Sequence, residues 1–280
     1  MKMLLVVGYG NMAKAILAQN TFIAQHYHLL ISGRDSQKIQ NFISSNHLNA
    51  QAFLTTQEQG QYVLDCENKD ILLCTKPKGL ESFIFKGKAD NVYSVLAGVG
   101  IASIQSHIQS HCIIRLMPNI AAHSKSSATA FYYCHQNNLD SILQREIRAF
   151  IESFGSAVRV DNEILIESSI ATSGSAIAFL SLVAESLIDA GVLEGLTHAQ
   201  SEALVKQCFA GFAKELAHKS PSELKYAISS PGGTTIRGLS ALEECGVRGA
   251  FIKAAHIAAQ YAKDCATSSN PTLDSHSSHK

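Results

Sequence analysis

The chain has 280 residues, enough for two domains, and its 23 basic and 23 acidic residues give a formal charge of zero. Without a basic field, a nucleic-acid partner is not expected. Apolar residues make up 46% and charged residues only 16%, which predicts apolar surface buried between subunits. No run approaches the ~18 consecutive apolar residues of a membrane span, so we expect no membrane partner and a cytoplasmic location.

The seven cysteines are scattered without a C-x-x-C pair, and the twelve histidines are dispersed. Disulfide frameworks and metal sites need closer, paired spacing. We therefore expect reduced core thiols and no metal site.

Apolar runs alternate with helical patterns through the first 160 residues. Strands are predicted at residues 3–7, 29–31, 70–75, 92–97, 113–117, 128–134 and 157–160. Strands alternating with helices imply right-handed crossovers and a parallel, doubly wound, Rossmann-like sheet. We expect a dinucleotide-binding domain of class α/β over residues 1–160.

A glycine turn, Gly8-Tyr9-Gly10-Asn11-Met12-Ala13, follows the first predicted strand and opens a helix. Gly8 permits the tight turn, Gly10 lets the backbone approach a pyrophosphate, and Ala13 allows close helix packing. The helix N-terminus supplies N–H groups for phosphate. This context predicts cofactor binding, with a purely structural turn as the alternative.

The end of the second strand indicates which cofactor is used. An NAD site usually places an acidic residue there to bind the ribose hydroxyls, whereas this chain has Ser32, followed by Gly33 and Arg34. Arg34 and Lys38 can meet a 2′-phosphate. NADPH is therefore predicted, with NADH as the alternative, and Asp35 is expected to cap the following helix.

Later strands also end in residues suited to a ligand, which in such sheets lies at the carboxyl ends of the strands. Thr75-Lys76-Pro77 ends one strand, and Lys76 is predicted at the cofactor edge, with a solvated surface charge as the alternative. Ala97-Gly98 would let a nicotinamide ring lie flat against the backbone. Arg115 lies within an apolar strand and is expected to have a buried ionic partner.

From about residue 163 the sequence becomes alanine-rich and helical in period, over residues 164–190, 197–218 and 239–265. A helix that is apolar on most sides must be enclosed. We expect an all-α dimerisation and substrate-binding domain over residues 161–266, in a homodimer with interleaved helices. Residues 267–280 are polar and are predicted to form a disordered tail.

The stretch Ser229-Ser230-Pro231-Gly232-Gly233-Thr234-Thr235 is predicted to be a tight loop that opens a helix. The free N–H groups and hydroxyls of such a loop point the same way. The loop can therefore hold a small anion.

The motif order G-x-G-x-M-A, T-K-P, A-G, R-x-M-P-N, S-G-S, D-A-G and S-P-G-G-T-T before L-E-E resembles the pyrroline-5-carboxylate reductase family over essentially residues 3–265. The resemblance implies an imine reductase that converts 1-pyrroline-5-carboxylate to L-proline with NADPH, the last step of proline biosynthesis. It also implies a dimer or an assembly of dimers, with a C-terminal domain like that of 6-phosphogluconate dehydrogenase. The chain departs from the family pattern at residues 176–179, which read Ala-Ile-Ala-Phe instead of Gly-Pro-Ala-Tyr, and at Ala227.

The resemblance also implies roles for individual residues. The substrate carboxylate would be bound by Ser230, Gly232, Gly233 and Thr234. Thr235 would be the catalytic residue, bonded to the ring nitrogen, and Glu163 would be an acidic residue on the substrate side. The cofactor-binding residues would be Val7, Gly8, Tyr9, Gly10, Asn11, Met12, Ser32, Gly33, Arg34, Cys74, Thr75, Lys76, Pro77, Val95, Leu96 and Ala97.

Two other functions stay open at the level of sequence. A β-hydroxyacid dehydrogenase shares the G-x-G-x-M turn and a helical second domain, and Lys206 or Lys214 would be its catalytic lysine. A non-catalytic NADPH-binding sensor is the second alternative, favoured only by the altered residues 176–179.

Overall fold

The computed structural model describes residues 1–53, 55–134 and 139–268. Contacts within the chain divide it into two compact units. The sheet unit comprises Met1–Gly174 and the chain from Ala258 onward, and the helical unit comprises Ser175–Ile257. The division predicted at residues 160 and 161 stays a sequence-based prediction.

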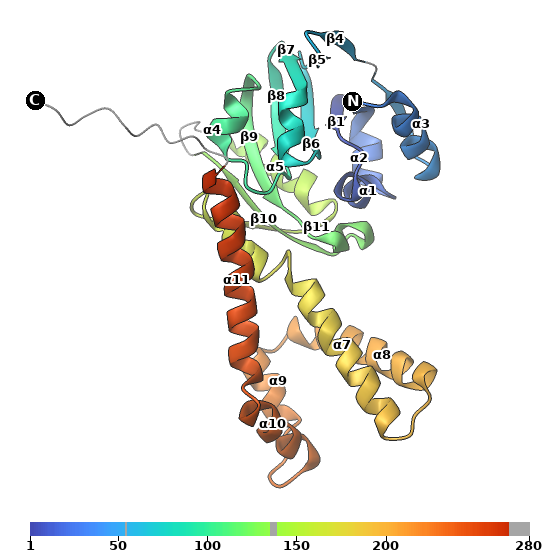
Figure 1. Ribbon diagram of the computed structural model, residues 1–280, viewed down its shortest axis with the longest axis vertical. Helices are drawn as coiled ribbons and strands as arrows, with labels where there is room; N and C mark the ends of the chain where they lie inside the picture. Colours follow the sequence, from blue (N-terminus) through green and yellow to red (C-terminus); the bar gives the residue numbers. More distant parts are fainter. Residues whose placement is uncertain (54, 135–138, 269–280) are drawn as a thin grey trace, which may run out of the picture. The chain divides into compact units, whose positions relative to one another are not determined.

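An eight-stranded sheet forms the centre of the sheet unit (Figure 1), in the spatial order β11-β10-β9-β8-β6-β1-β2-β3. Its strands are β1 (Lys2–Val7), β2 (Tyr27–Ser32), β3 (Ala50–Ala52), β6 (Lys69–Leu73), β8 (Ala89–Ser94), β9 (Ser110–Met117), β10 (Ser127–Tyr133) and β11 (Gly155–Arg159). Each predicted strand is present. The apolar runs of β1 and β6 are buried because both faces of a doubly wound sheet are covered. The predicted Rossmann-like architecture is confirmed.

Helices and 3-10 turns surround the main sheet. They are α1 (Asn11–Leu17), α2 (Thr21–His26), α3 (Ser36–Ser45), α4 (Ile101–Gln105), α5 (Ser141–Glu152), α6 (Leu165–Ser168), η1 (Pro77–Ser82), η2 (Ile120–Ser124) and η3 (Ser169–Ala171). The Asp35 carboxylate accepts the Lys38 N–H at 3.0 Å and caps α3, as predicted. On one face of the sheet, Phe150 of α5 stacks on Tyr93 with ring centroids 4.1 Å apart.

The main sheet is not parallel throughout. β9 and β10 pair antiparallel, with Met117 opposite Ala130. Only the short turn η2 joins the two strands, whereas a parallel pair needs a crossover of about a dozen or more residues. The expectation of a wholly parallel sheet is therefore wrong at this edge.

A second sheet of three strands, absent from the sequence prediction, consists of β4 (Thr56–Glu58), β5 (Gln61–Asp65) and β7 (Phe83–Lys86). β4 and β5 form a hairpin whose two turn residues, Gln59 and Gly60, have φ of 49° and 83°. Two positive φ angles in a two-residue turn suit a twisted hairpin. The sheet packs on the core of the sheet unit through its buried apolar residues, such as Leu64.

The helical unit contains α7 (Ala176–Leu193), α8 (His198–Leu216), α9 (Pro221–Ala227), α10 (Thr234–Glu244) and the beginning of α11 (Val247–Ser268). α7 and α8 approach closely: a Cβ on Gly191 would lie 2.1 Å from Ser201 Oγ. The Ser201 hydroxyl donates to the Ile188 carbonyl at 2.8 Å and so joins the two helices.

Two helices predicted as continuous are interrupted. The span 164–190 breaks after η3, and the span 239–265 breaks at Gly246, whose φ of 67° lies in the left-handed region that favours glycine. α11 continues to Ser268, so the tail predicted from residue 267 begins within this helix. Residues 269–280 of that tail lie outside the described residues.

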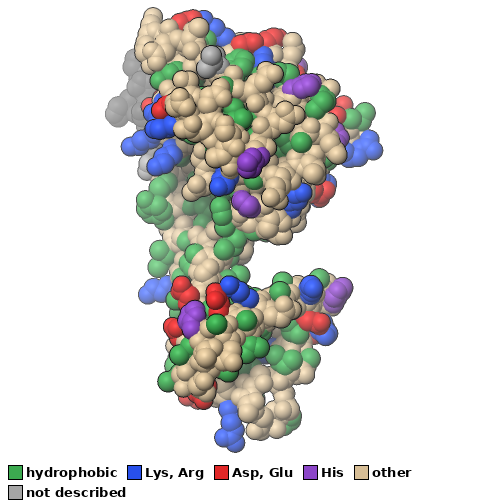
Figure 2. Space-filling model, turned by 90° about the vertical axis from the view of Figure 1, so that its right-hand side faces the viewer, with side chains coloured by type: hydrophobic (Ala, Val, Ile, Leu, Met, Phe, Trp, Pro, Cys, Tyr) green, Lys and Arg blue, Asp and Glu red, His purple; other side chains and the backbone are tan. Residues whose placement is uncertain are grey.

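The helical unit exposes large apolar side chains (Figure 2). α7 has no buried residue, and Leu182 is 61% exposed. Among the described residues, the segment Leu165–Leu193, which ends in α7, contains an 18-residue window of mean hydropathy 1.9, long and apolar enough by length and composition to cross a membrane. The predicted absence of a run of about 18 consecutive apolar residues holds in this segment, where Ser181 and Glu185 interrupt the apolar residues, so the finding rests on length and mean hydropathy.

Three of the seven cysteines are exposed, like the apolar side chains of the helical unit. Cys66 and Cys112 are buried and Cys74 and Cys134 partly buried, but Cys208, Cys245 and Cys265 are exposed. The prediction of core thiols is thus wrong for the last three, because they lie on the C-terminal helices or at their junction, where the single chain leaves side chains uncovered.

Candidate active site

Three strand ends meet at one edge of the main sheet. β1 lies between β2 and β6, and Val7 is in register with Ser32 on one side and Leu73 on the other. Because these strands are parallel, the residues that follow them leave the sheet at the same edge. The glycine turn and the loops after β2 and β6 are thereby brought together.

A cavity of about 470 Å³ lies at this edge. Its lining combines residues from all three loops with one segment that the sequence did not indicate. The lining residues are Gly8, Tyr9, Gly10, Gly33, Arg34, Cys74, Thr75, Lys76, Lys78, Gly79 and Phe83.

Two glycines of the cavity are required by close approach. Gly8 has a φ of 111°, and a Cβ there would lie 2.7 Å from the carbonyl of Cys74. A Cβ on Gly33 would lie 2.4 Å from the Tyr9 ring. Nothing lies within 4 Å of a Cβ built on Gly10, the residue before α1. Gly10 therefore leaves open space at the start of a helix whose first N–H groups have no partner in the helix.

The charged residues of the cavity are all basic. Arg34 follows β2, while Lys76 and Lys78 flank Pro77 at the start of η1, and all three side chains are exposed. Ser32 differs from them, because its buried hydroxyl donates to the Phe53 carbonyl at 3.1 Å. Arg34 is thus the side chain of the β2 loop that is free to reach an anion.

The Thr75 hydroxyl is a further sign that the cavity is built for a ligand. Thr75 Oγ1 is buried and has no hydrogen-bond partner among the described residues. A buried polar atom without a partner costs free energy unless a ligand or water satisfies it. The cavity therefore has N–H groups, cations and an unsatisfied hydroxyl, which are donors suited to a phosphorylated dinucleotide.

The residues predicted to bind the cofactor and the residues that line the cavity overlap only in part. Eight of the residues predicted to bind the cofactor are not among its lining: Val7, Asn11, Met12, Ser32, Pro77, Val95, Leu96 and Ala97. Lys78, Gly79 and Phe83 line it without having been predicted. The K-P-K-G run could have indicated Lys78 and Gly79, whereas no local signal marks Phe83.

Residues 95–101 continue from β8 at the same edge of the sheet. The Val95 N–H donates to the Leu73 carbonyl at 3.2 Å, so the end of β8 lies beside the end of β6. Ala97 is exposed, while the residues on either side of it, Leu96 and Gly98, are buried.

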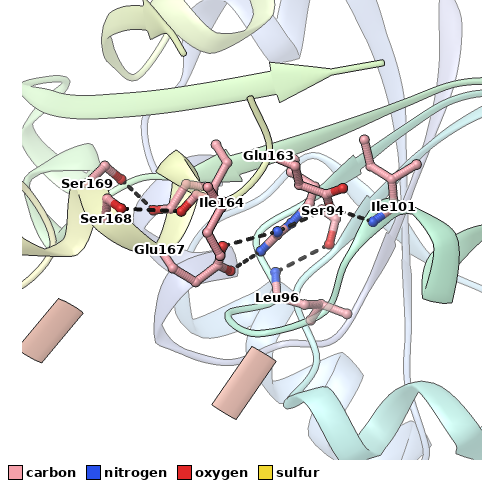
Figure 3. Close-up of polar contacts among 10 residues, drawn as sticks. Ser94, Leu96, Ile101, Glu163, Ile164, Glu167, Ser168 and Ser169 are labelled. Carbon is pink, nitrogen blue, oxygen red and sulfur yellow. Dashed lines mark hydrogen bonds and ion pairs between the residues drawn. The ribbon is translucent and has the colours of Figure 1, made fainter. Parts of the chain in front are cut away.

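Arg115 of β9 forms a charge cluster with Glu163 and Glu167, the two carboxylates labelled in Figure 3. Arg115 Nη1 donates to Glu163 Oε1 at 3.2 Å and to Glu167 Oε2 at 3.3 Å, and Nη2 donates to Glu167 Oε1. Arg115 and Glu167 are almost fully buried. The predicted ionic partner of Arg115 is confirmed.

Glu163 makes a second contact through the same oxygen. Glu163 Oε1 accepts the Ile101 N–H at 2.6 Å, at the beginning of α4. The Glu163 side chain is about one third exposed.

The loop of residues 229–235 lies in the helical unit and opens α10 as predicted, since Thr234 is the first residue of that helix. The Gly233 N–H donates to the Ser230 carbonyl at 3.0 Å, and Gly232 has a φ of 72°. α10 has no side-chain cap and no acidic residue in its first turn. Its N-terminus therefore presents uncapped N–H groups and a positive dipole end to an anion.

A second cavity, of about 650 Å³, lies beside this loop. Ser229, Ser230 and Pro231 line it together with Tyr226 of α9 and Ile236 of α10. Gly232, Gly233, Thr234 and Thr235 are not among its lining residues.

The fold and the cavity at the ends of β1, β2 and β6, called the cofactor groove below, define a dinucleotide-dependent oxidoreductase. It has a Rossmann-like sheet and a helical C-terminal unit. A family model for pyrroline-5-carboxylate reductase dimerisation matches residues 163–265. The pyrroline-5-carboxylate reductase of Helicobacter pylori strain J99 is 43% identical over 257 residues, which cover 91% of this chain and 97% of the relative. The chain belongs to the pyrroline-5-carboxylate reductase family.

Solved structures agree with this assignment. The 1-pyrroline-5-carboxylate reductase of Streptococcus pyogenes matches with a TM-score of 0.77 and 26% identity, over 94% of this chain and 98% of that one. The Plasmodium falciparum pyrroline carboxylate reductase, whose structure has NADP bound, matches with a TM-score of 0.71 and 22% identity, over 94% and 99%. At that identity the second match shows the fold alone.

Lys206 and Lys214, the lysines of the hydroxyacid dehydrogenase alternative, both lie on α8, and Lys214 is exposed. Lys206 is 72% exposed and forms an ion pair with Glu202, one turn away on α8. An exposed (i, i+4) pair is an ordinary feature of a helix surface. Family membership and this surface pair leave the dehydrogenase alternative without support.

Proposed function

We propose that the chain catalyses the NADPH-dependent reduction of 1-pyrroline-5-carboxylate to L-proline, the final step of L-proline biosynthesis. The observation that carries the proposal is the groove at the end of β1, where a glycine turn, Arg34 and the strand-end loop at Thr75 converge in a family member. NADPH supplies the hydride, and the protein binds and orients both reactants.

The groove residues divide into three roles in binding NADPH. The backbone from Val7 to Met12 holds the pyrophosphate through the free N–H groups that begin α1. Arg34 pairs with the 2′-phosphate, while Ser32 and Gly33 shape the turn that carries it. The hydroxyl of Thr75, which has no partner within the described part of the chain, donates to the bound cofactor.

The nicotinamide half lies at the ends of β6 and β8. Cys74 to Pro77 form one side, and Val95 to Ala97 form the other. Burial raises the pKa of the Cys74 thiol well above its ordinary value, so Cys74 stays a neutral thiol at physiological pH. It therefore acts as a small apolar wall and does not serve as a nucleophile.

The loop before α10 binds the substrate carboxylate. Ser230, Gly232, Gly233 and Thr234 supply a hydroxyl and uncapped N–H groups near the positive end of α10. The Thr235 hydroxyl donates a hydrogen bond to the ring nitrogen as the imine becomes an amine. A protonated imine is already electrophilic, so this enzyme works mainly by positioning.

The chain functions as a homodimer, and dimers can assemble further. Support comes from the dimerisation model over residues 163–265 and from the exposed apolar side chains of α7, such as Leu180 and Leu182. A second subunit would cover the apolar span of α7. We place the enzyme in the cytoplasm, and fractionation of cells that express it tests that location.

The test uses purified protein with pyrroline-5-carboxylate and either NADPH or NADH. The expected result is loss of NADPH absorbance with stoichiometric formation of proline, at a higher kcat/KM than with NADH. A hydroxyacid with NADP⁺ is the comparison for the dehydrogenase alternative. Binding of NADPH without turnover of either substrate would favour the sensor and would contradict the proposal.

A further inference from the structure

The turn of residues 95–101 is held by a hydrogen bond at each end, and between them it packs against α11. Near its start, Ser94 Oγ accepts the Leu96 N–H at 3.3 Å. In its middle, Gly98 has a φ of 75°, and a Cβ there would lie 3.4 Å from the backbone of Cys265 and Ala266 in α11. At its end, the Ile101 N–H donates to Glu163 at 2.6 Å.

The side chain of Glu163 is itself held in place. Its Oε1 accepts from both the Ile101 N–H and Arg115 Nη1, and Arg115 is held by two bonds to Glu167 (Figure 3). Arg115 and Glu167 are 3% and 1% exposed, so neither can move without uncovering a buried charge. The cluster therefore supplies a fixed point to which the backbone at Ile101 is attached.

We propose that Glu163 is a positioning residue, which holds the turn of residues 95–101 so that Ala97 presents a flat backbone face to the nicotinamide ring. This inference rests on the proposed function, in which that turn lines the nicotinamide half of NADPH. The family resemblance places Glu163 on the substrate side, but its Oε1 accepts the N–H of Ile101, the last residue of the cofactor turn, and is fixed there by Arg115 of β9. Glu163 acts through Ile101 and touches no reacting atom.

Because Glu163 Oε1 accepts both hydrogen bonds, two substitutions of Glu163 can separate the loss of charge from the loss of these bonds. In Glu163→Gln, the amide oxygen can still accept from both Ile101 and Arg115, although the negative charge is lost. In Glu163→Ala, both bonds are lost. If Glu163 works through hydrogen-bond geometry, Gln should preserve its effect and Ala should abolish it.

The readout compares NADPH with 2′-phospho-ADP-ribose, which lacks the nicotinamide ring. In Glu163→Ala, we expect kcat to fall about 10- to 100-fold, because misplacement of the reacting groups by about an ångström has that effect. The affinity for NADPH should fall toward that of the fragment, whereas the affinity for the fragment should stay within about twofold of the unmodified protein. Glu163→Gln should lie within about threefold of the unmodified protein in all three measurements.

A second variant breaks the same bond from the other side. Ile101→Pro removes the N–H donor at the first residue of α4, where proline is tolerated. Gly100, with φ −75° and ψ 163°, already has a conformation that a residue before proline can adopt. Ile101→Ala, which keeps the N–H, is the matched control for the lost side chain. Glu152→Gln, in an exposed ion pair of α5, controls for the loss of a carboxylate.

Several outcomes would overturn the proposal. These are an equal loss of affinity for NADPH and for the fragment, an unchanged kcat in Glu163→Ala, impairment of Gln as severe as that of Ala, or Ile101→Pro no worse than Ile101→Ala. The fragment measurement needs no turnover. If the unmodified protein binds NADPH but does not reduce pyrroline-5-carboxylate, the proposed function fails while the ring-specific loss of affinity can still be observed.

Discussion

A Cβ atom on Gly8 would lie 2.7 Å from the carbonyl carbon and oxygen of Cys74. The end of β1 and the end of β6 thus meet backbone to backbone, and the Cys74 N–H donates to the Val7 carbonyl at 2.9 Å. This contact closes the base of the cofactor groove. It also explains why the first glycine of the turn is needed for folding as well as for binding.

Gly8→Ala should therefore destabilise the fold. The φ of 111° is unfavourable for alanine, and the Cβ would meet backbone that cannot rotate away. We expect the free energy of unfolding to fall by more than about 1 kcal/mol, measured by urea denaturation at fixed protein concentration. Gly10→Ala is the matched control, since its Cβ has open space. That variant should keep its stability and lose affinity for NADPH, and a stable Gly8→Ala protein would contradict the steric argument.

Arg34 should determine the preference for NADPH over NADH. A charge-assisted hydrogen bond contributes about 1.5–3 kcal/mol, so Arg34→Ala should raise the KM for NADPH roughly 10- to 100-fold and leave the KM for NADH nearly unchanged. Steady-state kinetics with both cofactors measure this difference. Lys38→Ala is the comparison, because Lys38 forms an ion pair with Asp35 at 3.6 Å; it should change the preference less. Equal losses with both cofactors would rule out a 2′-phosphate contact.

Thr235→Ala should lower turnover while leaving the affinity for NADPH nearly unchanged. The variant removes the hydroxyl proposed to hydrogen-bond the ring nitrogen, and a neutral hydrogen bond contributes about 0.5–1.5 kcal/mol, so kcat should fall roughly 2- to 10-fold. Thr235→Ser keeps the hydroxyl and should recover most of the activity. The measurements are kcat with pyrroline-5-carboxylate and the Kd of NADPH, and a parallel loss in both would argue against the assigned role.

The contributions of Arg115 and Glu167 to the free energy of unfolding should depend on each other. Glu167→Ala leaves Glu163 as the only ionic partner of Arg115 among the described residues and should cost about 3–5 kcal/mol of unfolding free energy. The double variant Arg115→Met, Glu167→Met removes both buried charges and should cost much less than the sum of the single changes. A double-mutant cycle by urea denaturation measures the coupling, and additive costs would show that the ion pair is not coupled.

Asp70 should make stability depend on pH. Burial raises the pKa of its carboxyl, against the lowering effect of hydrogen bonds from Asn91 and Tyr27. Because the pKa of Asp70 is higher in the folded than in the unfolded protein, its protonated form stabilises the fold. This stabilisation is fully present at pH below the unfolded pKa. It is lost as pH rises through the folded pKa.

Asp70→Asn tests the sign of this effect. Asparagine keeps an oxygen for the Asn91 donors but does not titrate. The unfolding free energy of the unmodified protein, relative to the variant, should therefore decrease as pH rises from about 3 to 7. Chemical denaturation across that range provides the measurement. A relative stability that increases with pH would show that the hydrogen bonds outweigh burial.

The exposed apolar side chains of α7 show what a count of apolar residues can predict and what it misses. A count of consecutive apolar residues does not reveal the 18-residue window of mean hydropathy 1.9 within Leu165–Leu193. The same composition did predict helices that the single chain cannot enclose, and the exposed Leu182 agrees with that prediction. Apolar content indicates that these side chains must be buried, but it does not show which surface packs against them.

The sequence by itself determined the main-sheet strands other than β3, the glycine turn, the cap at Asp35 and the loop before α10. Each of these depends on neighbouring residues: apolar runs, positive-φ glycines and side chains that bond within one turn. Only the tertiary structure decided the antiparallel pairing of β9 with β10, the three-stranded sheet and the partners of Glu163. Ile101 and Arg115 lie 62 and 48 residues before Glu163, and contacts over such separations arise from packing, which no local pattern encodes.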